Sequence, residues 1–351
     1  MHMADALLSP AVAGTMYAAS TAVAALSVYK LKKEEKLTNE PTFKRLPTMA
    51  VMSALVFAGQ MINYTIPGTG SSGHICGGML LTALLGPYAG FLSMIAVLLI
   101  QCLFFADGGL MALGANIWNM AFYGCFVGYF LIFRPIMKSK LNTKVKLILG
   151  SILGCIITLQ MGAFSVVLET SLSGITELPF GSFVMLMQPI HLAIGLVEGL
   201  ATSAILVFVH STSPDLIKGV EKEESKKSSL KVTIAVLAAC VIVIGGGFSL
   251  LASGNPDGLE WALFGNTEYS EDRTNMGLDE ENFGLSGKVS EKAEAIQEKT
   301  SFLPDYAFSS DSENPLGTTV SGVVGSLIVA LIAAGICLLG GFFRKKSKKA
   351  A

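Results

Sequence analysis

The first two residues of the chain carry the most specific chemistry in the sequence. Met1-His2 places three nitrogens in series: the α-amine of Met1, the backbone amide of His2 and the His2 imidazole. These nitrogens can close two adjacent chelate rings on one small metal ion. A fourth nitrogen, such as that of His74, would complete a planar set. Tetragonal nitrogen coordination favours nickel(II) or copper(II) over zinc, which prefers a tetrahedron, so these residues predict a transition-metal site.

The segment that precedes His74 is expected to be a loop. Residues 67–73 are rich in Gly and Ser between two apolar stretches, and nothing in them favours a helix. Irregular backbone is not tolerated in contact with lipid, so the loop must line a cavity or lie at the surface. It can deliver His74, with Ser71 and Ser72 beside it, to a pocket. The alternative is a surface His74 bonded only to backbone.

Composition predicts that these residues sit in an all-α polytopic membrane protein. The chain is 52% hydrophobic and 15% charged, whereas soluble domains carry about 25% charge. One crossing takes about 20 apolar residues, and stretch 75–105 is long enough for two abbreviated helices that break at Gly86-Pro87. The predicted spans, nine passes in all, are 8–29, 47–66, 75–105 (two), 111–133, 146–169, 183–209, 231–252 and 320–343.

Basic residues give the predicted topology. Of the 25 Lys and Arg residues, 21 lie in four segments, 30–46, 134–146, 210–231 and 344–349. Nine passes place all four on one side, and positive loops face the cytoplasm. The prediction is therefore a multi-pass protein of the cell membrane with the N-terminus outside and the C-terminus in the cytoplasm. A single pass at 75–105 would turn the later basic loops outward.

The chain divides into two predicted parts. Residues 1–210 form a seven-pass bundle, and the charged segment 211–230 reads as a cytoplasmic linker. Residues 231–351 form a two-span hairpin that holds an extracytoplasmic segment, 253–317, with four Lys or Arg against 14 Asp or Glu, a net charge of −10. Within it, 289–299 is expected to be a short polar helix. The acidic segment can concentrate cations by its field or can be a solvated cap.

A retained N-terminus is a condition of the chelate hypothesis. The N-terminus lacks the basic region of a signal peptide, and its apolar run continues past Ala25. A bulky second residue such as His2 usually spares the initiator Met from removal. Cys76 is the one cysteine near possible chemistry, and core packing is its favoured role.

Further polar residues in or near the spans have two readings. Asp107, Asn116 and Asn119 lie near the outer ends of spans, where they can hydrogen-bond His74 or fix its loop; contacts between helices explain them equally well. His191 and Glu198 are seven residues apart and share a helix face. A proton or metal relay is one reading, and a buried polar contact between helices, or a contact to a partner subunit, is the favoured one.

Taken together, the motifs resemble the CbiM/NikM family of nickel and cobalt substrate-binding (S) components of energy-coupling factor transporters. The matching stretches, spread over roughly 1–210, are Met1-His2-Met3-Ala4-Asp5-Ala6-Leu7-Leu8-Ser9-Pro10, Gly73-His74 to Gly77-Gly78, Leu85-Gly86-Pro87-Tyr88-Ala89-Gly90-Phe91, Gln101, Asp107-Gly108-Gly109-Leu110, Ala112-Leu113-Gly114-Ala115-Asn116-Ile117-Trp118-Asn119-Met120, His191-Leu192-Ala193-Ile194-Gly195 and Glu198-Gly199. The hairpin resembles the small CbiN/NikN-type partner through Pro256-Asp257-Gly258-Leu259-Glu260.

The resemblance implies a function and partners. It implies that Met1, His2 and His74 hold nickel(II) or cobalt(II) as transported substrate, with no organic cofactor. It also implies that energy comes from a separate transmembrane coupling (T) component and ATP-binding-cassette ATPase subunits. The chain itself has no GxxxxGK[ST] sequence. Fused arrangements of this kind are associated more with nickel systems.

Two other functions were weighed against metal uptake with ATPase partners. A self-contained secondary transporter or channel would need a relay across the membrane, for which His191 and Glu198 are the only plausible pair. An intramembrane enzyme is disfavoured because the sequence has no HExxH motif, no GxSxG motif and no catalytic Asp pair. The prediction is therefore a transport subunit and not an enzyme.

Overall fold

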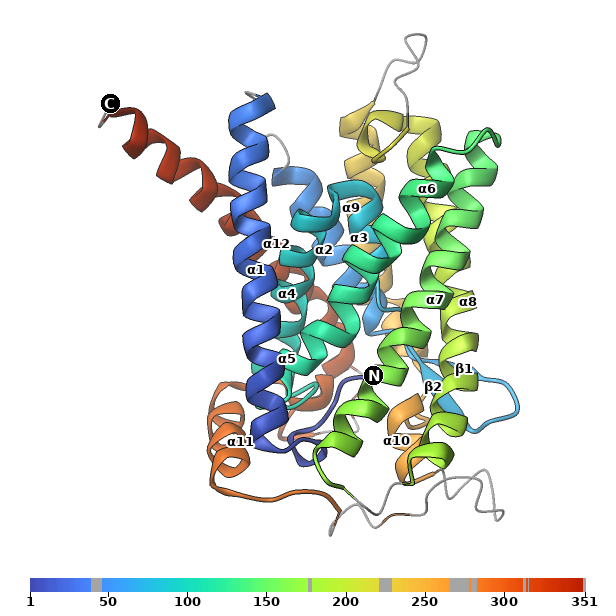
Figure 1. Cartoon of the computed structure of the whole chain (residues 1–351), viewed down its shortest axis with the longest axis vertical. Helices are drawn as coiled ribbons and strands as arrows, with labels where there is room; N and C mark the ends of the chain where they lie inside the picture. The colour runs from blue at the N-terminus through green and yellow to red at the C-terminus, as the bar shows by residue number, and fades with distance from the viewer. Residues whose placement is uncertain are drawn as a thin grey trace.

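The computed structural model describes residues 1–38, 46–175, 179–220, 229–265, 278, 283–311, 314 and 316–349, with backbone alone from 336 onward. Long helices run side by side along the vertical axis of Figure 1. Six described helical stretches are long and apolar enough to cross a membrane: Pro10–Leu37, Pro87–Phe105, Leu113–Met137, Thr143–Leu172, Phe180–Thr212 and Leu316–Gly335. The predicted all-α membrane fold is confirmed, and the count of nine passes stays a prediction.

The helices follow the predicted apolar stretches closely. They are α1 (Pro10–Thr38), α2 (Leu46–Gln60), α3 (Gly78–Leu85), α4 (Pro87–Phe105), α5 (Leu113–Asn116), the π-helix η3 (Ile117–Phe133), α6 (Arg134–Met137), α7 (Thr143–Leu172), α8 (Phe180–Thr212), α9 (Leu230–Gly246) and α12 (Leu316–Lys349). The shorter elements of the hairpin are η5 (Phe248–Leu251), α10 (Gly258–Leu263), α11 (Lys288–Thr300) and η6 (Pro304–Tyr306), and η1 (Asp5–Leu7) and η4 (Pro214–Leu216) flank the bundle. Helix α11 confirms the polar helix predicted at 289–299.

The predicted break at Gly86-Pro87 is confirmed. Gly86 has a φ of 87°, which glycine adopts at little cost, and it both ends α3 and precedes α4. Pro87 then occupies the first helical position, where a missing N–H is tolerated. With eight residues, α3 is about 12 Å long at 1.5 Å per residue. It runs from the His74 loop to a contact with the 214–220 segment, where Lys218 N donates to Ala83 O at 2.8 Å.

Glycines let the long helices approach closely. A Cβ on Gly195 or Gly199 of α8 would lie 2.8 Å from Ile156 Cα or 2.6 Å from Ile152 Cα of α7, so a larger residue would push these helices apart. The hairpin helices meet in the same way, because a Cβ on Gly245 would lie 3.0 Å from the carbonyl oxygen of Gly322. Close packing at small residues thus occurs within both parts of the bundle.

The segment before His74 is not helical, as predicted, and it forms a small hairpin. Strand β1 (Tyr64–Ile66) pairs antiparallel with β2 (Ser71–Gly73). The second part of the chain adds to this hairpin, because Ser72 N donates to Pro256 O at 2.8 Å and Ser72 forms a parallel bridge with Asp257. Helix α10 begins directly after this bridge. The His74 loop and the hairpin part are therefore joined by backbone pairing.

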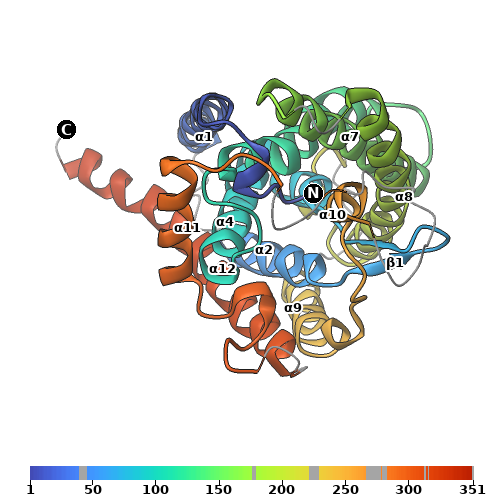
Figure 2. The ribbon, with the colours of Figure 1, turned by 90° about the horizontal axis from the view of Figure 1, so that it is seen from below.

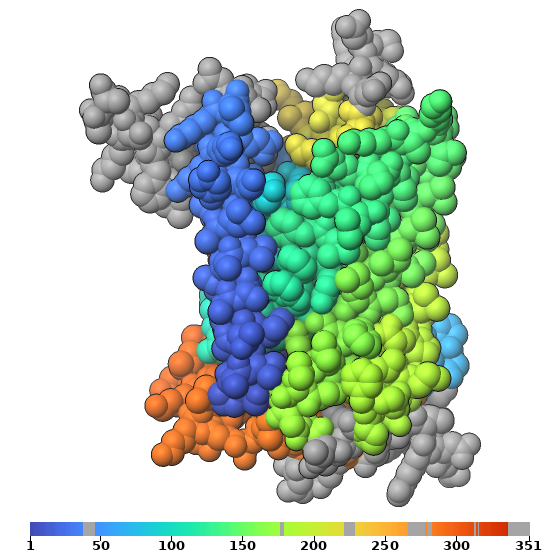
Figure 3. Space-filling view, in the orientation of Figure 1, coloured from blue at the N-terminus to red at the C-terminus, as the bar shows by residue number. Residues whose placement is uncertain are grey.

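Charge divides the bundle into two ends. Described parts of all four basic segments lie at the end that is uppermost in Figure 1: the end of α1, the α6–α7 turn, the chain between α8 and α9, and the end of α12. The N-terminus, α10 and α11 lie at the opposite end. We call these the basic end and the acidic end. Figure 2, which views the acidic end, has the N-terminus near the middle of the bundle beside α10. In Figure 3, α11 and its neighbouring chain cover the acidic end beside α1.

Candidate metal centre

The N-terminal segment enters the bundle instead of trailing from it. Met1 is 6% exposed and Met3 is fully buried. The backbone of Met3 is held on both sides: its N–H donates to Asn116 Oδ1 at 2.8 Å, and its carbonyl accepts from Asn116 Nδ2 at 3.2 Å and from Gly109 N at 2.9 Å. Asp5 Oδ1 accepts from Ala112 N at 2.9 Å. These contacts fix the position of the two residues before Met3.

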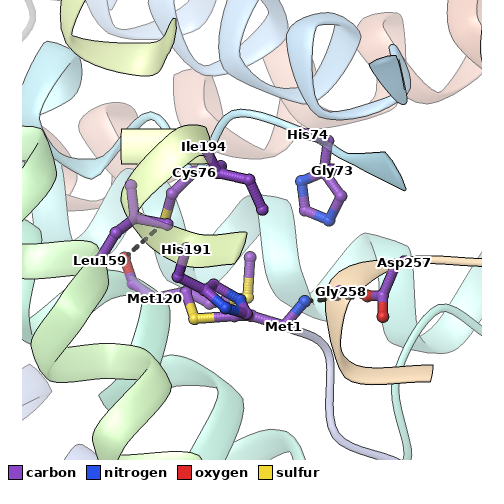
Figure 4. Close-up of a pocket in the computed structure, with 10 residues that line it drawn as sticks. All are labelled: Met1, Gly73, His74, Cys76, Met120, Leu159, His191, Ile194, Asp257 and Gly258. Carbon is purple, nitrogen blue, oxygen red and sulfur yellow. Dashed lines mark hydrogen bonds and ion pairs between the residues drawn. The ribbon is translucent and has the colours of Figure 1, made fainter. Parts of the chain in front are cut away.

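The α-amine of Met1 pairs with a carboxylate from the other part of the chain. Its nitrogen lies 2.9 Å from Asp257 Oδ2, and Figure 4 shows this contact at the mouth of a small cavity. The other oxygen of Asp257 accepts from Leu259 N and Glu260 N and so caps α10. Burial alone would raise the pKa of the Asp257 carboxyl, but the Met1 ammonium and these amides outweigh burial and hold that pKa below its usual range.

The imidazoles of His2 and His74 stack on each other. Their ring centroids are 5.3 Å apart with an interplanar angle of 25°. His2 Nδ1 lies 3.0 Å from Asp107 Oδ1, and His74 Nδ1 lies 3.0 Å from the carbonyl oxygen of Ile75. Burial is the main cause that lowers the pKa of His2 to about 3 and that of His74 to about 4. Both rings are therefore neutral near pH 7, which is the form that binds metals.

The hydrogen bonds also indicate which ring nitrogens carry lone pairs. A carbonyl oxygen only accepts, so His74 Nδ1 donates to Ile75 and Nε2 carries the lone pair. His2 Nε2 is buried and has no hydrogen-bond partner among the described residues. Chelation by the amine, the amide and the imidazole of residue 2 uses Nδ1, because that nitrogen closes the six-membered ring. His2 Nδ1, which contacts Asp107 in this structure, would therefore have to leave Asp107 in order to bind a metal.

A small cavity, which we call the inner cavity, lies beside the amine. It offers about 10 Å³ to the centre of a water-sized sphere, which is close to the space of one water or one ion. Figure 4 shows that four places in the chain supply its polar groups: the N-terminus, the His74 loop, α8 and Asp257 at the start of α10. Its lining residues are Met1, Gly73, His74, Cys76, Met120, Leu159, His191, Ile194, Asp257 and Gly258.

His191 presents a ring nitrogen without a partner in this region. Its Nδ1 lies 2.8 Å from the carbonyl oxygen of Met187, so Nδ1 donates and Nε2 carries the lone pair. His191 Nε2 is buried and has no hydrogen-bond partner among the described residues. Cys76 Sγ, in contrast, donates to Met120 O at 3.0 Å. His191 is thus a further nitrogen donor on the wall of the inner cavity.

Comparison with known proteins places the chain in a family. The CbiM family, described as "Cobalt uptake substrate-specific transmembrane region", matches residues 2–216, and the PDGLE domain matches residues 231–340. A putative fused nickel transport protein NikMN of Archaeoglobus fulgidus is 34% identical over 96% of this chain and 98% of its own length. The chain belongs to the CbiM family.

Other relatives match either nearly the whole chain or only its CbiM part. A fused nickel transport protein NikMN of Rhodobacter capsulatus is 28% identical over 97% of both chains. A cobalt transport protein CbiM of Sorangium cellulosum is 30% identical over 62% of this chain and 94% of its own. A crystal structure of a transition metal transporter covers 60% of this chain and 93% of its own, with 31% identity and a TM-score of 0.51. The relatives are transport proteins and not enzymes.

Asp107, Asn116 and Asn119 had two equal readings, bonds to His74 or its loop and contacts between helices. Asp107 and Asn116 bond neither His74 nor its loop by hydrogen bonds that the structure shows; they bond the N-terminal segment, at His2 and Met3. Asn119 Nδ2 donates to Glu169 Oε2 at 2.8 Å and lies 3.6 Å from the sulfur of Met3. The reason is spatial: these residues lie on the α4–α5 turn, α5 and η3, which pack against the N-terminal segment.

Glu198 contacts the loop that carries His74. Its two carboxylate oxygens accept from Cys76 N at 2.7 Å and Gly77 N at 2.8 Å, and these amides stand at the start of α3. Glu198 therefore satisfies backbone donors that the helix leaves open. The choice between a polar contact and a relay stays a prediction, and the contact that the structure shows is with a loop and not with a helix. His191, seven residues earlier, lines the inner cavity.

The two loop serines do different things. Ser72 Oγ donates to Asn255 O at 2.8 Å and joins the loop to the PDGLE part. Ser71 Oγ shares a hydrogen bond of 2.6 Å with Thr69 Oγ1 inside the turn. Both are fully buried, and neither lines the inner cavity. They shape the loop and do not face the site.

The structure adds Asp257 to the residues singled out from the sequence. The pentapeptide 256–260 marked the hairpin as a PDGLE domain, but nothing in it indicates that its carboxylate reaches an amine 256 residues earlier. Tyr306 was also missed; its hydroxyl donates to Asp107 Oδ2. Among the described residues there is no group of three or more His, Cys, Asp or Glu side chains that could hold a metal ion. An amine, an amide and two imidazoles do not make up such a group.

Proposed function

We propose that this chain is the substrate-binding membrane subunit of an ATP-driven energy-coupling-factor importer for nickel(II) or cobalt(II). One observation supports it most strongly: the His2 and His74 rings stack on each other, and Met1 lines the inner cavity together with His74. The relatives named as nickel and cobalt transporters support the same function.

The proposed ligands are four nitrogens. Met1 supplies its α-amine, His2 its backbone amide and Nδ1, and His74 its Nε2. A planar nitrogen set suits nickel(II) best, and cobalt(II) remains a candidate because neighbouring metals differ little in intrinsic affinity. Each ligand must be free of its proton to bind. Loading therefore requires Asp257 to release the amine and Asp107 to release His2.

The proposed direction of transport follows from charge. The basic end faces the cytoplasm by the positive-inside rule, so the N-terminus and the acidic end face outward, where the metal arrives. The coupling component and the ATPase subunits would then engage the cytoplasmic side. They are proposed from the family resemblance.

A self-contained secondary transporter is the second candidate. It would use His191 and Glu198 as a relay for protons or metal. Both oxygens of Glu198 accept hydrogen bonds from the His74 loop, so a relay would have to break the contacts that hold the loop in place. Metal uptake by this chain in vesicles without any ATPase partner would favour this candidate.

The test is a titration of the purified chain, with its native N-terminus, with nickel and with cobalt. His2→Ala and a form with one Gly added before Met1 are compared with a form that has one Gly added after Ala351. We expect tight 1:1 binding in the native chain and in the C-terminal control, and loss in both N-terminal variants. If binding survives the N-terminal addition, the amine is not a ligand and the proposal fails.

A further inference from the structure

A second cavity opens on the acidic end beside the inner one. It offers about 270 Å³ to the centre of a water-sized sphere, against about 10 Å³ for the inner cavity. We call it the antechamber. Both parts of the chain build it, and the described residues that line it are His2, Ala4, Asp5, Ala106, Asp107, Gly108, Gly109, Asp257, Glu260, Glu294, Gln297 and Asp305.

The antechamber is lined by carboxylates. Six of its twelve described lining residues are Asp or Glu, and none of the twelve is Lys or Arg. Asp257 and Asp107 already have partners in the Met1 amine and His2. Glu260 accepts from Asp257 N at 3.0 Å as part of the α10 cap. Glu294 of α11 and Asp305 of η6 add negative charge from the far wall. A wall of this kind attracts cations.

A second observation points to a ligand in this cavity. Asp5 is 3% exposed, and its Oδ2 is buried with no hydrogen-bond partner among the described residues. The His2 side chain is 5% exposed, and its Nε2 is likewise buried with no hydrogen-bond partner among the described residues. Both residues line the antechamber. Buried polar atoms are rarely left without a partner, and an acceptor oxygen and an imidazole lone pair both suit a metal-bound water, which donates hydrogen bonds.

Size indicates the form in which a cation would sit here. One water needs about 10–15 Å³ of such space, so the antechamber accommodates an ion together with its shell of waters. The inner cavity has room for little more than a bare ion. Asp257 is the one described residue that lines both cavities. A cation that leaves the antechamber for the inner cavity therefore passes the carboxylate that pairs with the Met1 amine.

We propose that the antechamber is a second cation site, which binds a hydrated divalent cation through its waters before the ion exchanges them for the nitrogens of the inner site. The place of this site on the loading path rests on the proposed function; the binding of a hydrated cation does not. Because waters separate the ion from the carboxylates, the site responds to charge and size and takes nickel, cobalt and magnesium alike.

Hexaamminecobalt(III) is the probe that separates the two sites. Its ammines donate hydrogen bonds as bound waters do, but they do not exchange, so the complex cannot use the inner nitrogens. The test variant is Glu294→Gln with Asp305→Asn. Asn suits the φ of 50° at position 305. The matched control, Glu291→Gln with Glu298→Gln, removes two exposed carboxylates from the same helix, α11, outside the antechamber.

Calorimetry at low salt then decides. We expect the native chain and the control variant each to bind one hexaamminecobalt(III) ion. We expect the test variant to bind it at least tenfold more weakly. We also expect hexaamminecobalt(III) to slow the association of nickel with the native chain. Equal binding in the test and control variants would mean that the general surface charge attracts the probe, and absence of binding to the native chain would equally overturn the proposal.

A third variant distinguishes failure of this proposal from failure of the proposed function. His74→Ala removes a residue that lines the inner cavity and not the antechamber. We expect it to lose tight nickel binding and to keep hexaamminecobalt(III) binding within about twofold. If His74→Ala keeps tight nickel binding, the proposed nitrogen site is wrong, and the antechamber proposal is unaffected. Hexaamminecobalt(III) binding lost with His74 would show that the two cavities are one site, which contradicts a separate antechamber.

Discussion

The inner cavity and the antechamber share the lining residue Asp257, yet they offer a cation different surroundings. The inner cavity is narrow, with neutral imidazoles and an amine among apolar side chains; the antechamber is wide and acidic. Carboxylates and water suit hard cations in general, whereas imidazole and amine nitrogens suit nickel, cobalt and copper. Under the two proposals, the difference separates two tasks: charge collects cations at the acidic end, and nitrogen geometry selects among them.

The largest expected effect concerns a ligand of the inner cavity. His74→Ala removes the fourth nitrogen of the proposed planar set. We expect nickel affinity to fall by more than about 100-fold, beyond the 10–100-fold that the loss of an outer partner typically costs. Nickel titration of purified protein measures it, with His210→Ala at the basic end as the matched control. If His191→Ala proves as damaging as His74→Ala, His191 also binds the metal and the planar set is wrong.

The next effect concerns the position of the N-terminal segment between the two cavities. A Cβ on Gly109 would overlap the side chain and the backbone nitrogen of Asp5, so Gly109→Ala must displace the segment that carries His2. We expect a loss of nickel affinity of about 10–100-fold, as for a displaced outer partner. Titration and thermal unfolding in detergent measure this. Gly181→Ala, with nothing within 4 Å of its Cβ, is the control. Native affinity in Gly109→Ala would mean that the segment need not be held in place.

Proton release on metal binding tests whether the His2 and His74 imidazoles are neutral before the metal binds. Burial lowers the pKa of His2 to about 3 and that of His74 to about 4. At pH 6 both imidazoles already lack the extra proton, whereas imidazoles with the ordinary pKa of about 6.5 would be mostly charged. We therefore expect nickel to release protons from the Met1 amine and the His2 amide but none from imidazolium. Calorimetry in buffers of different ionisation enthalpy counts them; a count near four at pH 6 would contradict neutral rings.

The smallest effect concerns the residue that the two cavities share. Asp257→Asn keeps a side chain that caps α10 but removes the charge that pairs with the Met1 amine. We expect faster hydrogen exchange at the Met3 amide, by about tenfold, in line with a lost hydrogen bond to a charged group. Exchange in α7 should not change, which serves as the internal control. Unchanged exchange at Met3 would mean that Asn116 alone holds the N-terminal segment.

Local chemistry in the sequence predicted a large part of this molecule. Apolar length predicted the helices, Gly86-Pro87 predicted the break between α3 and α4, and polar composition predicted α11. The stacking of His2 on His74, and the place of Met1 and His74 on one cavity, agree with the predicted chelate, whose ligands stay a prediction. Each of these inferences depends on neighbours in sequence or on the coordination demand of one ion.

Contacts across the two parts of the chain could not be predicted in the same way. Nothing near Asp257 indicates that it meets Met1, 256 residues away, or that it separates two cavities. Asp107 had two equal readings, a bond to His74 or its loop and a contact between helices, because an expected depth in the membrane names no partner. The packing of helices decides which neighbour a carboxylate meets, and the glycines that allow this packing carry no directional signal.

X-ray absorption of the nickel-loaded chain with its native N-terminus is the most direct test of the proposed centre. The account predicts a planar shell of four nitrogens, with the scattering pattern of two imidazoles and no sulfur. A six-coordinate shell rich in oxygen would place the metal on Asp107 and Asp257 instead, and a sulfur scatterer would place it on Cys76 or a methionine. Either result would contradict the N-terminal chelate.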